Sequence, residues 1–217
     1  MTDANVDGAK VTRRLSVFPL GGALLFPGMH LPLHVFEPRY RALVSDAMAR
    51  DQMIGMIQPK PATTREEADR PQLFGVGCVG KIAQVEALDD GRYNLVLEGI
   101  ARFTLVRELD VSTPFRQVEG MLEAIREDEA LASIQRADLE REAKAFAQAQ
   151  GYEVDWDQIE RLDDATFVNG IAQIAPFDAA AKQALLEAPD VADRAELIVQ
   201  LLRFFGRHDG DNKVTLQ

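Results

Sequence analysis

The stretch from Leu15 to Tyr40 constrains the fold more than any other part of this chain. It reads LSVFPLGGALLFPGMHLPLHVFEPRY and places four prolines among β-branched and aromatic residues. Because proline has no N–H to donate to a β-ladder, strands interrupted by proline belong at a sheet edge or on the rim of a barrel. Pro38 is different, since proline is tolerated in the first turn of a helix. The stretch therefore predicts short edge strands that lead into a helix.

Strands and turns continue from this stretch to about Val118. The predicted helix has one apolar face with three-to-four spacing, made by Tyr40, Leu43, Val44, Ala47 and Met48. A strand is expected over Met53–Ile57. Residues 58–72 carry three prolines and six charges, which predicts a surface loop.

Residues 74–88 alternate like a strand until the pattern slips between Ile82 and Val85, which predicts a β-bulge. The Asp-Asp-Gly sequence at residues 89–91 is a hairpin turn signal. Two further strands are expected after this turn: Tyr93–Glu98 and Phe103–Val106.

Beyond Pro114 the composition changes from strand formers to helix formers. Residues 128–150 contain neither Gly nor Pro and are rich in Ala, Glu, Gln and Arg, which predicts a long helix. Because Asp is a favoured N-cap, further helices are expected to begin near four aspartates: Asp155, Asp164, Asp178 and Asp190. The last helix carries an apolar stripe, and Gly206 is expected to end it. Strands followed by helices predict an α+β protein with two segregated lobes.

The chain is expected to divide into four regions. They are a flexible tail over residues 1–12, a β-barrel lobe over 13–119, a helical bundle lobe over 120–208 and a second flexible tail over 209–217. Of the net charge of −11, almost all lies in residues 120–217, which hold 10 basic and 20 acidic residues. An acidic lobe repels phosphate backbones, so nucleic acid is not expected as a partner.

The composition also indicates the compartment. A single cysteine, Cys78, allows no internal disulfide and suits a reducing environment. The polar N-terminus has no signal-peptide pattern, and no run approaches the roughly 18 apolar residues that cross a bilayer. We expect a cytoplasmic protein without membrane association.

One glycine-rich segment invites a nucleotide-binding interpretation. Gly75-Val76-Gly77-Cys78-Val79-Gly80 matches G-x-G-x-x-G letter for letter, and with Lys81 it approaches a P-loop. Both motifs need a helix N-terminus after the glycines to hold phosphate, whereas these glycines lie inside a predicted strand. Ile82 also stands where a P-loop has Ser or Thr. We interpret the glycines as residues that make room in a tight barrel, and we expect no cofactor.

The sequence contains no catalytic or metal-binding constellation that we recognise. His30 and His34 are four residues apart, but Pro32 forbids a regular helix, and a strand separates them by about 13 Å. Cys78 alternates with apolar neighbours, as a small buried side chain does. A hydrolase that pairs Cys78 with a histidine is one alternative, but we expect a protein that is not an enzyme and holds no metal.

A series of short segments runs through most of the chain in a fixed order. They are Val17-Phe18-Pro19-Leu20, Leu25-Phe26-Pro27-Gly28, Leu31-Pro32-Leu33, Phe36-Glu37-Pro38-Arg39-Tyr40, Gly75-Val76-Gly77-Cys78, Asp90-Gly91-Arg92, Leu97-Glu98-Gly99-Ile100-Ala101-Arg102-Phe103, and Lys182-Gln183-Ala184-Leu185-Leu186-Glu187 with Arg194 and Leu197. In this order and spacing they resemble the Lon protease N-terminal domain family over roughly Leu15 to Phe205.

This resemblance implies a PUA-like twisted β-barrel followed by an α-helical bundle. In full-length Lon proteases the region captures substrates and precedes an ATPase and a peptidase, and their motifs are absent from this sequence. The resemblance therefore implies a stand-alone bacterial member of the family that binds unfolded or partner polypeptides without catalysis. One role it implies is an adaptor in protein quality control, acting with a protease in trans.

The candidate peptide-binding surface consists of apolar residues around the predicted rim: Phe26, Met29, Leu31, Phe36 and Tyr40. Exposed on a rim, they would form a docking patch, whereas in the interior they would only fill the barrel. The alternative interpretation is a PUA-like protein that binds RNA or a small ligand. Five arginines are the candidates for a basic RNA-binding cluster, which the sequence alone does not decide: Arg39, Arg41, Arg65, Arg70 and Arg102.

Overall fold

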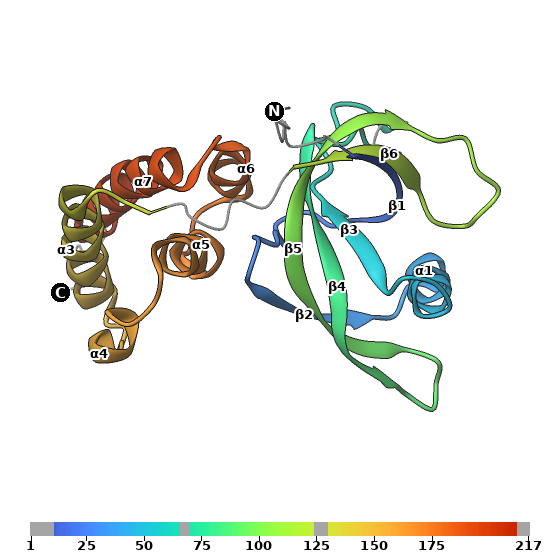
Figure 1. Ribbon diagram of the computed structural model, residues 1–217, viewed down its shortest axis with the longest axis horizontal. Helices are drawn as coiled ribbons and strands as arrows, with labels where there is room; N and C mark the ends of the chain where they lie inside the picture. The colour runs from blue at the N-terminus through green and yellow to red at the C-terminus, as the bar shows by residue number, and fades with distance from the viewer. Residues whose placement is uncertain (1–10, 66–69, 124–129, 212–217) are drawn as a thin grey trace, which may run out of the picture. The chain divides into compact units, whose positions relative to one another are not determined.

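Figure 1 shows the chain in a computed structural model, which describes residues 11–65, 70–123 and 130–211. Side chains are described as far as Gly206. The chain divides into a strand unit, residues 1–126, and a helical unit, residues 127–217.

Regular structure crosses the expected region boundaries by a few residues. Strand β1 begins at Val11, inside the expected N-terminal tail, and helix α7 continues to Asp211, inside the expected C-terminal tail. Strand β6 spans the expected boundary between residues 119 and 120, since it runs from Gln117 to Leu122. The rest of both tails lies outside the described residues.

The described part of the strand unit contains β1 Val11–Pro19, β2 His30–Val35, α1 Pro38–Met48, β3 Met53–Ile57, β4 Val76–Ala87, β5 Tyr93–Glu108 and β6 Gln117–Leu122. The predicted helix start at Pro38 and the predicted strand β3 are confirmed. Pro38 occupies the first turn of α1, where its missing N–H costs no intrahelical hydrogen bond. Much of the expected loop 58–72 has no regular structure, and four of its residues lie outside the described part.

The six strands form one mixed sheet, in which β1 and β3 are parallel and the other pairs antiparallel. Their order is β2-β5-β4-β3-β1-β6, and β6 also pairs with β5. These pairings close a ring through β5, β4, β3, β1 and β6, and they leave β2 outside that ring. The α+β class is confirmed, but the sheet is not a simple barrel, because β2 extends it beyond the closed ring.

Strand β5 differs from its prediction, because the two expected strands are parts of one strand of 16 residues. The residues between them, from Gly99 to Arg102, continue the pairing with β4 through a register shift at Val79/Gly80. A Cβ at Gly99 would lie 2.1 Å from the carbonyl oxygen of Phe26. Glycine is needed here because the loop before β2 approaches the backbone of β5 closely.

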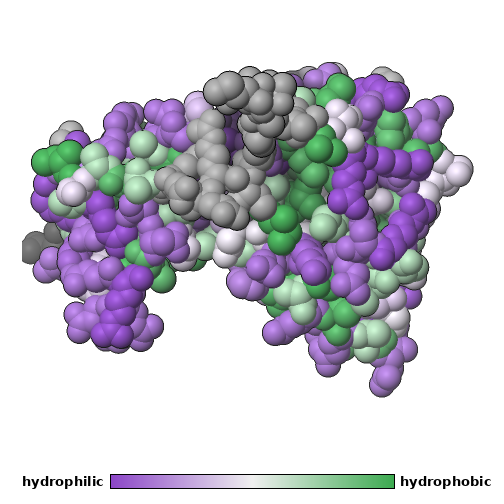
Figure 2. Space-filling view, viewed as in Figure 1, coloured by the Kyte–Doolittle hydropathy of each residue, from purple (hydrophilic) through white to green (hydrophobic). Residues whose placement is uncertain are grey.

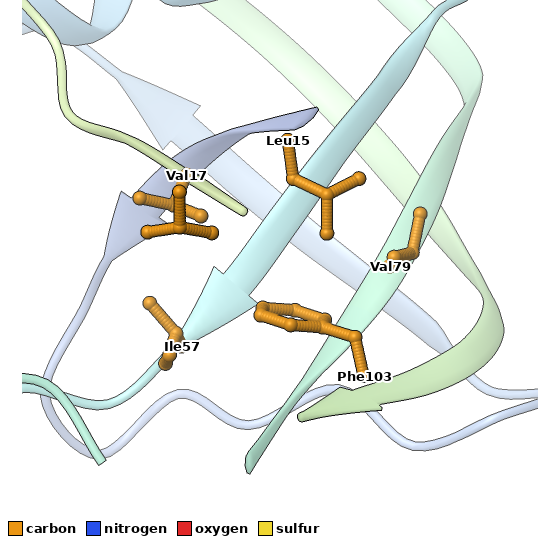
Figure 3. Close-up of a cluster of buried hydrophobic side chains, with 6 residues drawn as sticks. Leu15, Val17, Ile57, Val79 and Phe103 are labelled. Carbon is orange, nitrogen blue, oxygen red and sulfur yellow. The ribbon is translucent and has the colours of Figure 1, made fainter. Parts of the chain in front are cut away.

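The interior of the ring is packed around Phe103, which is fully buried. Figure 3 shows its ring among neighbours from β1, β3 and β4, and the cluster consists of Leu15, Val17, Ile57, Val79, Phe103 and Val118. A Cβ at Gly77 would lie 2.6 Å from the Phe103 ring, and one at Gly120 would lie 2.9 Å from it. Gly77 therefore makes room for an aromatic ring, and β4 leads into β5 rather than into a phosphate-binding helix. The packing interpretation is confirmed for Gly77 and for Gly80, whose Cβ would lie 2.8 Å from Leu25, but not for Gly75, where a Cβ would meet nothing within 4 Å.

The described part of the helical unit contains α3 Ser133–Gln150, α4 Trp156–Ile159, α5 Asp164–Ile174, α6 Ala179–Glu187 and α7 Val191–Asp211. Four of these helices begin as predicted, at an aspartate whose carboxylate accepts a hydrogen bond from the backbone N–H three residues later. The capping residues are Asp155, Asp163, Asp178 and Asp190, so the second cap is one residue earlier than expected. Within the described helices none has the length and apolar character of a membrane span.

Two helix ends differ from their predictions. Helix α3 begins at Ser133, whereas a start at residue 128 was expected; residues 128 and 129 lie outside the described part. Helix α7 does not end at Gly206, because tertiary contacts hold the preceding turn in place. Arg203 pairs with Glu142 of α3 at 2.9 Å, and the Phe205 ring packs against Phe177. Such contacts override the weak helix preference of one glycine.

Candidate functional site

Strand β2 pairs on one side only, with β5, and among the described residues no strand lies along its other edge. Its two faces differ, as the two-residue period of a strand requires. His30, Pro32 and His34 are exposed, whereas Leu31 and Leu33 are half-buried. The strand therefore presents a polar outer face, an apolar inner face and an open backbone edge.

A shallow groove of about 520 Å³ lies over β2, β5 and β4. Six of its lining residues form two cross-strand rows: Pro32–Val96–Gln84 and His34–Asn94–Glu86. The predicted β-bulge is confirmed between Ile82 and Gln84, and it sets the register that brings Gln84 beside Val96. The groove thus combines one mainly apolar row with one polar row.

The polar row is tied together by side-chain hydrogen bonds. Asn94 Nδ2 donates to Glu86 Oε2 at 2.9 Å, and Asn94 Oδ1 lies 2.7 Å from His34 Nδ1. Arg92 Nη1 lies 3.2 Å from His34 Nε2. Because a guanidinium can only donate, Nε2 accepts and the proton of the imidazole sits on Nδ1, from which it is donated to Asn94. The network fixes the His34 ring at the β2 end of the row, with Asn94 in the middle.

Arg92 also connects the row to the β4–β5 hairpin turn. Its Nε donates to Asp90 Oδ2 at 2.6 Å, and its backbone N–H donates to Asp90 Oδ1 at 3.1 Å. These hydrogen bonds lower the pKa of Asp90, the backbone bond contributing most. Gly91 adopts a φ of 79° in this turn, which glycine does without strain.

Phe36 lies directly after β2 and is 61% exposed. Its ring stacks on His34, with the two ring centroids 6.3 Å apart. Met29 before β2 and Leu31 within it are half-buried. We call these three residues, with the outer edge of β2, the β2 surface. It combines a large exposed aromatic side chain at the end of β2 with two half-buried apolar side chains near its start.

Two of the five residues expected on this surface lie in the interior instead. Phe26 is fully buried, because its backbone packs against Gly99. Tyr40 is 7% exposed, stacks on Phe18 at 4.0 Å between ring centroids and donates its hydroxyl to the carbonyl of Pro19 at 3.2 Å. Burial raises the pKa of Tyr40. Neither side chain can therefore contact a partner directly.

Figure 2 shows one face of the molecule, on which apolar side chains lie in patches between polar ones. Among the described residues of the helical unit, the most exposed large apolar side chains are Ile174 on α5, at 82%, and Ile134 on α3, at 72%. Phe204 on α7 is 56% exposed, and its ring is perpendicular to that of Phe205 in a T-shaped arrangement. These residues are scattered over three helices.

The other chemical candidates receive little support from the geometry. His30 and His34 both lie on β2, and no group of three or more potential metal ligands occurs in the described part of the chain. Cys78 is fully buried, so a substrate cannot reach its thiol while the sheet is intact. This position argues against the hydrolase alternative.

Three of the five arginines that are candidates for an RNA-binding cluster are paired with carboxylates. Arg39 pairs with Glu37 at 2.7 Å, Arg70 with Glu108 at 2.7 Å and Arg102 with Glu123 at 2.6 Å. Each pair neutralises a charge that phosphate binding would use. Nothing here favours RNA over a polypeptide.

Sequence reasoning missed the polar row and the groove. The row is assembled from Glu86, Asn94 and His34, which lie on three different strands. A signal was present in the alternation of polar and apolar residues in Tyr93–Glu98, but a single strand does not indicate its neighbours. Cross-strand pairs become visible only when the register is known.

Comparison with known proteins gives a consistent result. Residues 14–203 match the family described as the ATP-dependent protease La (LON) substrate-binding domain. The chain is 27% identical to Lon protease 2 of Myxococcus xanthus over 197 residues, which cover 87% of this chain and 23% of that protein. It therefore spans about a quarter of the length of the curated relatives it matches.

Two solved structures share the fold. The N-terminal domain of the Mycobacterium avium complex Lon protease superposes with a TM-score of 0.67 at 20% sequence identity. The Lon N-terminal domain protein from Xanthomonas campestris superposes with a TM-score of 0.62 at 24% identity. Each similarity covers 88% of this chain and 98% of the other.

Proposed function

The chain belongs to the Lon substrate-binding domain family, and we propose that it is a non-catalytic module that binds unfolded or partner polypeptides through the β2 surface. The observation that carries this proposal is Phe36, which is 61% exposed at the end of a strand with an open edge. Large aromatic side chains are frequent anchors at protein interfaces, because they bury much area at a small cost in conformational entropy.

The surroundings of Phe36 suit a polypeptide better than a small molecule. The groove beside it is shallow and open to solvent along three strands, whereas small-ligand sites enclose most of their ligand. Its polar row can donate and accept hydrogen bonds, and Met29 and Leu31, near the start of β2, add apolar contact further along the strand. A flexible chain can use both kinds of contact along its length.

For the biological role we propose an adaptor in protein quality control, which binds a polypeptide and presents it to a protease in trans. The acidic helical unit would favour a partner with a basic surface. Cytoplasmic location is part of this proposal, because unfolded clients and a quality-control protease would have to meet there.

The proposal can be tested by fluorescence anisotropy with a labelled polypeptide that is reduced, alkylated and therefore permanently unfolded. The full chain is compared with Phe36→Ala and with Phe204→Ala, a control of the same residue type and similar exposure on α7. We expect Phe36→Ala to weaken binding about tenfold or more, as loss of an interface anchor does, and Phe204→Ala to change it little. Absence of binding by the unmodified chain, or equal loss in both variants, would contradict the proposal.

A further inference from the structure

We propose that the bound polypeptide adds to the sheet as an extended strand, hydrogen-bonded to the open edge of β2. This inference rests on the proposed function and specifies how the β2 surface binds. An exposed sheet edge offers unpaired backbone groups at regular intervals, and extended peptides recognise such edges in many binding domains.

The orientation of the β2 backbone follows from two observations. The N–H of Gly99 donates to the carbonyl of Met29 at 2.8 Å, so Met29 faces β5. In an antiparallel pair, alternate residues face the partner, so Leu31, Leu33 and Val35 share this orientation. Pro32, which has no N–H, then points its nitrogen away from β5, as a proline in an edge strand must.

The backbone groups of Pro32 and His34 therefore face the open edge. Pro32 and His34 offer carbonyl oxygens to an added strand, and His34 also offers an N–H. Every second residue of a strand faces the same side, and such residues are about 6.8 Å apart. The hydrogen-bonding groups of an added strand have the same spacing. An incoming segment can therefore make consecutive ladder bonds along β2, except for the donor that Pro32 lacks.

Pro32 also indicates which polypeptide pairs better with the open edge of β2, a second copy of this chain or a different protein. In a pair of β2 strands centred on this residue, two prolines would face each other, and neither could supply the N–H that the other's carbonyl needs. A segment of another polypeptide brings a backbone N–H to the Pro32 carbonyl. The edge is thus less suited to self-association than to a foreign strand.

The side chains of β2 indicate which segments fit. On the inner face, Leu31 and Leu33 are half-buried and would be covered by apolar residues of the added strand. On the outer face, the polar row would continue with polar residues opposite His34. The expected ligand is an extended segment with alternating apolar and polar residues, as exposed by unfolded β-sheet proteins. The side chains of an amphipathic helix repeat about every 3.6 residues, so they do not match the two-residue repeat of β2.

The experiment compares His34→Pro with His34→Ala in the full chain. Both variants remove the imidazole and its bonds to Asn94 and Arg92, but only the proline removes the backbone N–H at the open edge. Binding is measured by anisotropy with a labelled peptide of alternating valine and threonine. We expect His34→Pro to bind about tenfold more weakly than His34→Ala, since one ladder bond and its geometry are lost. Circular dichroism checks that both variants fold.

A second measurement does not depend on the variants. Amide hydrogen exchange of the unmodified chain is followed with and without the peptide, and the His34 amide is expected to become protected on binding. Equal affinity of the two variants together with an unprotected His34 amide would overturn the strand-addition inference and leave polypeptide binding intact. Absence of any peptide or unfolded-chain binding would overturn the proposed function, and this inference with it. A dimer of the unmodified chain that His34→Pro dissociates would show that a second copy occupies the edge, contrary to the proposal.

Discussion

The two halves of β5 pair with different neighbouring strands. The second half, from Ala101 to Glu108, lies between β4 and β6 inside the closed ring, where Phe103 fills the interior. The first half, Tyr93–Glu98, lies between β4 and β2, and the sheet ends at β2. One strand thus belongs to a closed, tightly packed region and to an open one.

We infer from this difference that the closed region of the sheet supplies stability and the open region supplies binding. In the closed region glycines are required by close packing, so the segment that most resembles a nucleotide-binding motif serves the core. In the open region polar side chains form rows, and an aromatic residue remains exposed. We expect substitutions in the closed region to reduce the free energy of unfolding and substitutions in the open region to reduce binding.

The largest effect is expected for Phe103→Ala. Removing a fully buried ring leaves a cavity, and such substitutions typically cost about 3–5 kcal/mol of unfolding free energy. Urea unfolding followed by circular dichroism measures this cost. Val106→Ala, on the same strand but 53% exposed, serves as the control and should cost much less. Similar costs for both variants would mean that the ring interior is not the main stabilising core.

A somewhat smaller effect is expected for Gly77→Ala. Its new Cβ would lie 2.5 Å from the carbonyl oxygen of Met56 and 2.6 Å from the Phe103 ring, so neighbouring atoms must move. Overpacking of this kind costs about 1–3 kcal/mol. Gly75→Ala is the matched control, because nothing lies within 4 Å of a Cβ there. If denaturation midpoints of the two variants coincide, the close-packing explanation of the glycines fails.

A further prediction concerns Glu108, at the closed end of β5. Arg116 binds both of its carboxylate oxygens, at 2.9 and 2.6 Å, and Arg70 adds a third contact at 2.7 Å. The hydrogen bonds from Arg116, followed by those from Arg70, lower the pKa of Glu108 in the folded chain. Its stabilising contribution is therefore fully present above the unfolded pKa of about 4.3 and is lost as pH falls through the lower folded pKa.

The substitution Glu108→Gln should remove this contribution. Since the carboxylate is partly exposed, we expect a loss of about 1 kcal/mol at pH 7, shrinking as the pH falls below about 4. Thermal unfolding of both proteins between pH 7 and pH 3 measures the difference. A stability difference that stays constant over this range would show that the charge of Glu108 is not its source.

The smallest effect on stability is expected for Phe36→Ala in the open region. An exposed side chain away from the core usually changes the unfolding free energy by no more than about 0.5 kcal/mol. The same variant should nevertheless lose most of its affinity for unfolded polypeptide. Parallel urea unfolding and anisotropy titrations would reveal the contrast, and a Phe36→Ala protein that is strongly destabilised would break the proposed separation of the two regions.

Local features of the fold could be predicted from the sequence because local chemistry determines them. Pro38 predicted a helix start, the slip after Ile82 predicted the β-bulge, and aspartates predicted four helix caps. In each case the signal and the structure it specifies lie within a few residues of each other. The continuity of β5 could not be predicted, since Gly99 resembles a break until its approach to Phe26 is known.

The candidate site was predictable only in part, for the same reason. Phe36 is exposed, and Met29 and Leu31 are half-buried, at the edge strand that the prolines of the opening stretch indicated; their role in binding stays a prediction. Phe26 and Tyr40 belong to the same stretch, but partners distant in sequence bury them, and no local pattern distinguishes them. The polar row needed the register of three strands, which one sequence does not reveal.

The most direct test of the central claim is an amide chemical-shift titration of the isotope-labelled full chain with an unfolded polypeptide. We expect the largest shift changes from Met29 to Phe36 and in the facing residues of β5, with the amides around Phe103 nearly unchanged. Shift changes confined to the helical unit or to the ring, with β2 unaffected, would contradict the assignment of binding to the open region.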